Sequence, residues 1–297
     1  MPRPALILHG GAGARRDRDY GRESEHMGEV VRAMAARLAA GAAALDVVVE
    51  TLVLLEDSGL YVAGRGASPN LAGDYELDAS LMDGPTRRAG AVAAFQGYRN
   101  PIRAARAVMD HTPHVLLAGS GAAAFAADQG LEPIDDPATW FTRAGLDEDN
   151  HPPGQGRSAA LAHGTVGCCV LDAQGRLAAG TSTGGVFGKL PGRVGDTPLP
   201  GAGVWASDRV AVSCTGQGEY FIRTQAAAAV DWRVQSGQSL REAGSAAIAE
   251  IGTMGGDGGL IALDAQGRRA DPFNSQGMKR AWLTPDGDVG VEVFGRS

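Results

Sequence analysis

The chain has 297 residues, of which 44% are hydrophobic and 21% charged, a proportion typical of a globular protein. Its formal net charge is -7 and its acidic and basic residues are interspersed, which argues against nucleic-acid binding. No segment is long enough to cross a bilayer, and the apolar residues 4–8 are too few for a signal peptide. We therefore expect a cytoplasmic protein whose partners include neither nucleic acids nor membranes.

The chain before residue 145 predicts one strand, then helices, then further strands. Residues 5–9 form an apolar strand, and the glycines of residues 10–13 predict a turn after it. Asn100 and Pro101 have the pattern of a helix N-cap followed by proline at the first helical position. Apolar spacing and composition predict helices at 25–40, 43–56 and 101–109, and strands at 89–96 and 114–118. A short alanine-rich helix follows the second of these strands and ends at about residue 128.

From residue 145 to 164 the chain is polar and rich in glycine and proline, with no apolar periodicity. This composition predicts a mobile linker that could be cut without disrupting a hydrophobic core. After the linker the sequence predicts two β-hairpins with two helices between them. The hairpins join 165–172 to 177–182 and 260–264 to the residues after 267, and the helices lie at about 219–235 and 239–251. Because hairpin-linked strands contradict a doubly wound parallel sheet, we predict a layered α/β packing.

The cysteines do not resemble a disulfide framework, because there are three of them and Cys168 and Cys169 are adjacent. These two and Cys214 lie in apolar, strand-like runs, which predicts buried and unreactive thiols. None of the six histidines has a zinc-type spacing such as H-E-x-x-H, so the sequence predicts no side-chain metal site.

Thr165 stands where the linker meets an apolar strand. A threonine hydroxyl is a weak nucleophile at neutral pH unless a base lies beside it. Scission of the peptide bond before Thr165 would give this residue a free α-amine, whose reference pKa of about 7.7–8.0 leaves part of it neutral at pH 7. Gly164 has no Cβ, so it could adopt a strained backbone that exposes its carbonyl carbon to attack. One residue would then supply both nucleophile and base.

A series of short motifs, mostly containing glycine, runs along the chain. In order they are His9-Gly10-Gly11-Ala12-Gly13; Ala63-Gly64-Arg65-Gly66; Glu76-Leu77-Asp78-Ala79 with Met82-Asp83-Gly84; Asn100-Pro101; Gly164-Thr165-Val166-Gly167; Thr181-Ser182-Thr183-Gly184-Gly185; Gly192-Arg193-Val194-Gly195-Asp196; Ser213-Cys214-Thr215-Gly216 with Gly218-Glu219; Gly255-Gly256-Asp257-Gly258-Gly259; and Pro272-Phe273-Asn274. One glycine-rich stretch would indicate little. The ordered series resembles the plant-type L-asparaginase/isoaspartyl peptidase family of N-terminal-nucleophile hydrolases over nearly the whole chain.

The resemblance implies an α/β fold, namely a four-layer αββα sandwich of the N-terminal-nucleophile type with mostly antiparallel sheets flanked by helices. It also implies self-cleavage between Gly164 and Thr165. The products would be an alpha subunit, residues 1–164, and a beta subunit, residues 165–297, of a single domain. The family usually forms homodimers of such processed protomers.

The resemblance further implies the roles of several threonines and a glycine. Thr165 would be the catalytic nucleophile, and Thr183 would hydrogen-bond it and help to tune its environment. Thr215 and the amide of Gly216 would contact substrate and form the oxyanion hole, which stabilises charge on the attacked carbonyl. The implied reaction is hydrolysis of L-asparagine and of β-aspartyl (isoaspartyl) dipeptides through a β-aspartyl ester on Thr165, with no cofactor for catalysis.

Arg193 and Asp196 would clamp the α-carboxylate and α-amine of an aspartyl group, chemistry that suits a guanidinium fork and a carboxylate. In three places the chain departs from the family pattern, because Val62 and Gly188 stand where asparagine is usual and Cys168 and Cys169 replace smaller residues on the nucleophile strand. By analogy with relatives alone, a structural sodium ion would be wrapped by backbone carbonyls of a loop that includes Leu55, Glu56, Ser58, Tyr61, Ala63 and Arg65.

Three other interpretations remain open at this stage. A glycosylasparaginase would share the chemistry, but that branch typically has aspartate before the nucleophile, where this chain has Gly164. A nucleotide-binding enzyme would use the glycines of residues 10–13, which nevertheless lack the P-loop ending and the G-x-G-x-x-G spacing. A non-catalytic binding protein could also retain the fold, because a fold does not guarantee activity.

Overall fold

The computed structural model describes residues 3–142, 144 and 164–295, so the predicted linker at 145–164 lies outside the described residues except for Gly164. None of the helices in these ranges is long and apolar enough to cross a bilayer. The helices are α1 (Gly21–Ala39), α2 (Ala44–Asp57), the 3-10 helix η1 (Gly64–Gly66), α3 (Pro101–His111), α4 (Gly119–Asp128), α5 (Pro137–Trp140), α6 (Gly218–Thr224), α7 (Ala226–Gln235) and α8 (Leu240–Thr253). The strands are β1 (Ala5–Ala12), β2 (Leu77–Asp83), β3 (Ala89–Phe95), β4 (Leu116–Ala118), β5 (Val166–Leu171), β6 (Leu177–Thr183), β7 (Val204–Ala206), β8 (Val210–Gly216), β9 (Gly258–Asp264), β10 (Arg269–Ala270), β11 (Met278–Leu283) and β12 (Val289–Glu292).

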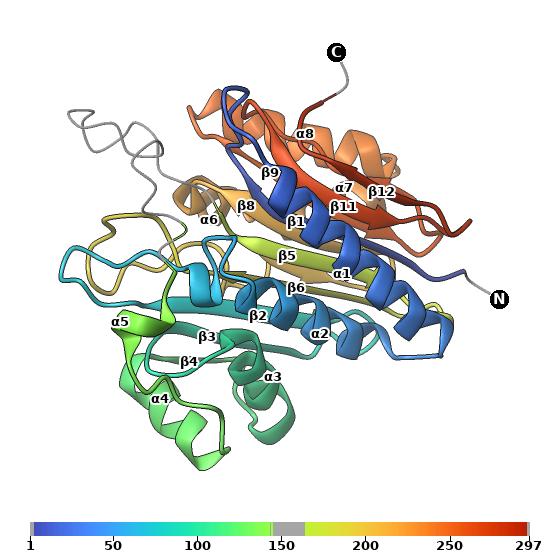
Figure 1. Ribbon diagram of the computed structural model, residues 1–297. Coiled ribbons are helices and arrows are strands. Elements are labelled where there is room, and N and C mark those ends of the chain that lie inside the picture. The colour runs from blue at the N-terminus through green and yellow to red at the C-terminus, as the bar shows by residue number, and fades with distance from the viewer. Residues whose placement is uncertain (1–2, 143, 145–163, 296–297) are drawn as a thin grey trace.

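The described strands form two sheets (Figure 1). The larger sheet has the strand order β12-β11-β1-β5-β6-β2-β3-β4, and the smaller has the order β10-β9-β8-β7. Strands pair antiparallel in both sheets, apart from the parallel pair of β3 and β4. Both predicted hairpins are present, as β5–β6 in the larger sheet and β9–β10 in the smaller. The predicted α/β class with hairpin-linked antiparallel strands is therefore confirmed.

The strands of the larger sheet bury both of their faces. Along β1, Leu6 and Leu8 pack with helices α1, α2 and α3, whereas Ala5 and Ile7 pack in the core between the two sheets. A third hydrophobic cluster joins the smaller sheet to helices α6, α7 and α8. Figure 1 shows α1 and α2 running across the larger sheet, with α7 and α8 beyond the smaller one. Helices therefore cover the outer face of each sheet.

The cysteines are free and fully buried, as predicted. Cys168 and Cys169 are neighbours on β5, so one faces the helices and the other the core between the sheets. Burial raises the pKa of Cys168 to about 12, which keeps this thiol protonated and unreactive at neutral pH.

The predicted turn at residues 10–13 is wrong, because β1 continues through Ala12. The strand is irregular here, since its register with β11 shifts between His9 and Ala12 and Gly11 has φ 100°. A positive φ is open to glycine at little cost, so the glycines permit a bulge that keeps the strand paired. They do not form the strand-to-helix junction that a phosphate-binding loop requires.

The single helix predicted at 219–235 is in fact two helices, α6 and α7, separated by Gln225. This residue has φ 50° and ψ 46°, the left-handed conformation that ends a helix. Beyond it, the amide of Ala228 donates to the carbonyl of Gly201 at 2.9 Å, so the first turn of α7 is fixed by a distant loop. Apolar spacing continues through the break and therefore does not reveal it.

Helix α3 begins at Pro101 as predicted, but the side chain of Asn100 does not cap it. Asn100 instead donates to Asp57 Oδ1 at 2.8 Å. The carboxyl group of Glu56 accepts the amide of Ile102 at 3.2 Å and so satisfies one of the free amides of the first turn. The end of α2 therefore caps the start of α3.

Strands β2, β7, β11 and β12 do not follow from the local patterns of the sequence. In β2 the apolar run is interrupted by Asp78 and Ser80, which are fully buried. Asp78 accepts the amide of Ala94 at 2.8 Å, and the hydroxyl of Ser80 donates to the carbonyl of Thr197. Buried polar side chains with distant partners hide a strand from any search for apolar alternation.

Candidate active site

Thr165 directly precedes β5, which lies between β1 and β6 in the interior of the larger sheet. The residue is 8% exposed, and its hydroxyl donates to Oγ1 of Thr183 at 3.0 Å. Thr183 is the last residue of β6, the hairpin partner of β5. The hairpin therefore brings the predicted nucleophile and its predicted partner together.

Thr183 is hydrogen-bonded to the predicted nucleophile but cannot deprotonate it. Its Oγ1 also accepts the amide of Gly185 at 3.0 Å and lies 3.5 Å from the carbonyl oxygen of Val62. The oxygen thus receives two donors, and a threonine hydroxyl is not a base at neutral pH. In the unbroken chain the nitrogen of Thr165 is a non-basic amide, so this pair still requires a base.

Gly164, the residue before the predicted nucleophile, packs against Val62. A Cβ at position 164 would lie 2.3 Å from Val62 Cγ2 and 2.7 Å from Val62 N, closer than atoms can approach. Only glycine fits here without a shift of the backbone of residue 62. Val62, one departure from the family pattern, therefore closes the space beside the predicted cleavage site.

A small cavity of about 10 Å³ brings most of the predicted site residues together. Thr165, Thr183, Arg193, Asp196 and Gly216 all line it. This volume is close to the minimum for one water molecule and far below that of an amino acid. Binding of an aspartyl group at this position therefore requires movement of the surrounding residues.

Arg193 and Asp196, the predicted substrate clamp, differ in their present partners. Arg193 forms a two-pronged ion pair with Glu219, with Nε–Oε1 and Nη2–Oε2 distances of 2.9 and 3.0 Å. Asp196 Oδ2 is buried and has no hydrogen-bond partner among the described residues. Burial raises the pKa of Asp196 to about 7, although the nearby Arg193 opposes this shift. An incoming ammonium group would satisfy this carboxylate.

The loop between β6 and β7, which carries the substrate clamp, is anchored through Glu76. The buried Lys189 donates from Nζ to the carbonyl oxygen of Glu76 at 2.5 Å. The carboxylate of Glu76 accepts the amide of Gly192 at 2.8 Å and Nδ2 of Asn70 at 3.1 Å. These bonds hold the clamp loop against the loop that precedes β2.

Gly188, the second departure from the family pattern, lies in the same loop with φ 66°. Glycine and asparagine are the residues that adopt this left-handed conformation most readily. The substitution therefore keeps the backbone shape that an asparagine would also allow.

Thr215 and Gly216, the predicted oxyanion hole, end β8 in the smaller sheet. Gly216 lines the site cavity and has φ 151°, and a Cβ there would lie 2.5 Å from the carbonyl oxygen of Asp257. The side chain of Thr215 is 1% exposed, and its Oγ1 accepts the amide of Ala12 at 3.2 Å. Thr215 itself is absent from the described residues that line the cavity, so it borders the site without opening onto it.

The loop predicted to wrap sodium follows α2 and includes η1. Several of its carbonyls already accept hydrogen bonds, such as Leu55 from the Ser58 hydroxyl and Tyr61 from the amide of Ala63, both at 2.8 Å. Each carbonyl oxygen has a second lone pair and can still bind a hard cation. The described residues contain no group of three or more His, Cys, Asp or Glu side chains placed to hold a metal.

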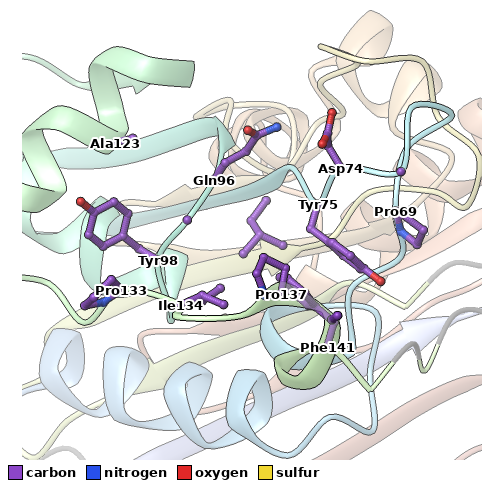
Figure 2. Close-up of a pocket in the computed structure, with 14 residues that line it drawn as sticks. Pro69, Asp74, Tyr75, Gln96, Tyr98, Ala123, Pro133, Ile134, Pro137 and Phe141 are labelled. Atoms are coloured by element: carbon purple, nitrogen blue, oxygen red, sulfur yellow. The ribbon is translucent and has the colours of Figure 1, made fainter.

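A second cavity, of about 810 Å³, lies apart from these residues (Figure 2). The rings of Tyr75 and Phe141 stack beside it with centroids 3.7 Å apart, and Tyr98, Ile134 and Pro137 also line it. None of the predicted site residues is among the described residues that line it. The candidate site is therefore placed by the paired hydroxyls and the predicted clamp and not by cavity size.

Residues 2–291 match the family described as asparaginase. The chain belongs to this asparaginase family. It is 44% identical over 301 residues to the isoaspartyl peptidase of Salmonella typhimurium, covering 95% of this chain and 96% of that protein. It is 41% identical to the plant-type L-asparaginase of Pyrobaculum calidifontis, with 97% and 99% covered, and 36% identical to the isoaspartyl peptidase/L-asparaginase of Homo sapiens, with 93% and 91% covered.

Three residues beside the site of this asparaginase-family chain received no role from the sequence. They are Glu76, Lys189 and Glu219, which anchor the clamp loop or pair with Arg193. Glu76 and Glu219 stand within the motifs that carry the family resemblance, so those motifs were a usable signal. Lys189 contacts a residue 113 positions away, a relationship that one sequence does not display.

Proposed function

We propose that this asparaginase-family protein is an autoproteolytically activated hydrolase that cleaves L-asparagine and β-aspartyl dipeptides. The observation that carries the proposal is the 3.0 Å hydrogen bond from Thr165 to Thr183 in a cavity that Arg193 and Asp196 also line. The cavity thus combines a hydroxyl nucleophile with a cation that suits the α-carboxylate of an amino acid and an anion that suits its α-ammonium group. The names of the relatives, isoaspartyl peptidase and L-asparaginase, support the same activity.

Activation begins with attack of the Thr165 hydroxyl on the carbonyl carbon of Gly164. A C–O bond forms, the C–N bond to Thr165 breaks, and the hydroxyl proton ends on the departing nitrogen. Water then hydrolyses the ester between the two residues, which leaves a carboxylate on Gly164 and a free hydroxyl and α-amine on Thr165. The non-basic amide is thereby converted into the missing base.

In the mature enzyme the α-amine of Thr165 takes the proton of its own hydroxyl, which attacks the β-carbonyl of the substrate. The amide of Gly216 stabilises the oxyanion, joined by the hydroxyl of Thr215 once the movement needed for substrate binding exposes it to the cavity. Donors of this kind each contribute about 3–4 kcal/mol. The amine returns the proton to the leaving ammonia or amino acid. Water hydrolyses the β-aspartyl ester and releases aspartate.

Glycosylasparaginase activity fits this site less well. That alternative depends on an aspartate before the nucleophile, and position 164 is closed by Val62 to any side chain. The residue present, Gly164, supports the preference for free asparagine and β-aspartyl dipeptides.

The proposal extends to architecture and environment. The three large hydrophobic clusters lie between helices and the larger sheet, between the two sheets, and between the smaller sheet and its helices, which supports a four-layer αββα sandwich. Scission would cut this sandwich into an alpha subunit, residues 1–164, and a beta subunit, residues 165–297. The exposed side chains of Leu71 and Leu190, 62% and 65% accessible, support a homodimer contact. We assign the protein to the cytoplasm from its composition. The carbonyls of Leu55, Glu56, Ser58, Tyr61, Ala63 and Arg65 would hold a structural sodium ion that has no part in catalysis.

The function is tested by mass spectrometry of the purified protein followed by assays on two substrates. We expect two fragments, the smaller beginning at Thr165, with ammonia release from asparagine and cleavage of a β-aspartyl dipeptide. Hydrolysis of a glycosylated asparagine, with neither of the other substrates cleaved, would show that the alternative is correct.

Substrate binding should depend on pH through Asp196, whose folded-state pKa is raised to about 7 by burial. Below that pH the carboxyl group is neutral and cannot pair with the substrate ammonium. The ionised fraction of Asp196 rises about 10-fold from pH 6 to pH 8, so KM should fall about 10-fold over the same range. Asp196→Asn should have a higher KM that no longer changes with pH, measured by steady-state kinetics. Asp208→Asn, an exposed control, should retain the dependence. If KM of Asp196→Asn varied with pH as it does in the wild type, Asp196 would not be part of the clamp.

Ionisation of Asp196 should also lower the free energy of unfolding. Because the folded-state pKa of Asp196 is raised, the native protein holds this proton more tightly than the unfolded chain does. Protonated Asp196 therefore adds to the free energy of unfolding. This contribution is complete below the pKa of the residue in the unfolded chain, about 4, and is lost as the pH rises through its pKa in the folded protein, about 7. Asp196→Asn should remove that loss.

A further inference from the structure

His9, from the first motif of the chain, lies at the centre of a buried chain of hydrogen bonds. Its Nδ1 lies 3.0 Å from the carbonyl oxygen of Thr165, and its Nε2 lies 3.0 Å from Oγ of Ser213 on β8. Ser213 Oγ lies in turn 2.7 Å from Oγ1 of Thr181 on β6. His9, Ser213 and Thr181 are fully buried. The ring therefore joins the nucleophilic residue to the smaller sheet.

The positions of the protons in this hydrogen-bond network follow from the atoms that can only accept. A carbonyl oxygen only accepts, so Nδ1 of His9 must carry a proton. Burial lowers the pKa of His9 to about 3, so the ring is neutral and Nε2 is an acceptor. The hydroxyl of Ser213 then donates to Nε2. Thr181 Oγ1 lies 2.7 Å from Ser213 Oγ and 3.2 Å from the carbonyl oxygen of Gly203, so its one proton goes to the shorter contact, with Ser213 as the acceptor. With Nε2 protonated instead, Nδ1 and the Thr165 carbonyl would face each other as two acceptors.

Gly167 makes room for this arrangement. It lies opposite His9 in the pairing of β1 with β5. A Cβ at position 167 would lie 1.9 Å from Ser213 Oγ and 2.3 Å from His9 Nε2. The histidine ring and the serine hydroxyl therefore occupy the volume that any other residue at position 167 would need.

β1 also contacts the predicted oxyanion hole. Ser213 lies two residues before Thr215, so their side chains are on the same face of β8. Thr215 Oγ1 accepts the amide of Ala12, three residues after His9. One strand thus contacts the nucleophilic residue through His9 and the oxyanion strand through His9 and Ala12.

We propose that His9 is a positioning residue, which in its neutral Nδ1–H tautomer sets Thr165 at a fixed distance from Thr215 and Gly216. It takes no proton from the hydroxyl, because its one donor is held by a carbonyl oxygen and its one acceptor by Ser213. The proposal rests on the proposed role of Thr165 as nucleophile. A displacement of about 1 Å at a reacting group can cost about 100-fold in rate, so this spacing controls kcat.

The test compares His9→Asn with His9→Leu, both measured per cleaved chain. Asparagine keeps an N–H donor at the branch position of histidine Nδ1, whereas leucine has a similar shape and no donor. We expect kcat to fall about 10- to 100-fold in His9→Leu and less than about 10-fold in His9→Asn, with KM within about 3-fold of wild type. Ser213→Ala is the second variant should His9→Leu fail to fold, and His26→Asn is the matched control.

Two results would overturn the proposal. One is a wild-type kcat in His9→Leu, and the other is a loss in His9→Asn as large as in His9→Leu together with a missing limb in its pH profile, which would make His9 a base. Nitrogen-15 NMR of the histidine rings provides a measurement independent of activity. The His9 resonances are those that the wild type shows and His9→Asn lacks. At pH 5.5 we expect them to be those of a neutral ring protonated on Nδ1. A protonated Nε2 would contradict the assignment, whereas an inactive, uncut wild-type protein would contradict the proposed function alone.

Discussion

Replacement of Thr165 by alanine is expected to leave one full-length chain of 30.5 kDa and to abolish hydrolysis. In the proposed function this hydroxyl attacks both Gly164 and the substrate, so one substitution should remove both reactions. Loss of a covalent nucleophile costs kcat about 10⁴-fold or more. A denaturing gel and intact-mass measurement detect the first effect, and an ammonia-release assay detects the second.

Two variants make this prediction specific. Thr165→Ser keeps the hydroxyl and its bond to Thr183, so it should be cut and should hydrolyse substrate at a reduced rate. Thr253→Ala removes an exposed threonine from the end of α8 and should behave as wild type. Two normal fragments from Thr165→Ala would mean that scission uses another nucleophile, and the function proposed here would then be wrong.

Arg193→Ala is expected to raise KM for asparagine by about 30- to 150-fold while scission before Thr165 proceeds normally. A guanidinium that forms a two-pronged bond with a carboxylate contributes about 2–3 kcal/mol, which corresponds to this change in affinity. The substrate carboxylate must displace Glu219, the present partner of Arg193. Steady-state kinetics and the fragment pattern measure the two effects separately.

Comparison with two neighbouring changes identifies the cause. Arg193→Lys keeps the charge but not the planar fork, so it should recover only part of the affinity. Glu219→Gln weakens a pair whose glutamate is 54% exposed, so it should change KM by no more than a few fold. A normal KM in Arg193→Ala would show that another residue binds the substrate carboxylate.

Local patterns in the sequence identify most of the elements. Both hairpins, the helices α1, α2 and α8, and the start of α3 follow from apolar spacing, turn residues and proline, which act over a few neighbouring residues. The break at Gln225 and the continuation of β1 through Gly11 do not follow from these patterns. Each depends on bonds to a segment far away in the chain, such as the loop at Gly201 or strand β11.

For the site, the sequence by itself determined which residues belong together, because their types and order match a family that the chain proves to belong to. It placed Thr165 at the start of a strand and paired that strand with residues 177–182, which end next to Thr183. Only the tertiary structure decided what surrounds the two hydroxyls. Three contacts each join residues from distant segments. They are the ion pair of Arg193 with its partner, the tight fit of Gly164 against Val62, and the contact of the His9 ring with Thr165. Such contacts arise from the packing of strands and loops on one another, and a pattern read along one chain contains no record of which distant residues meet.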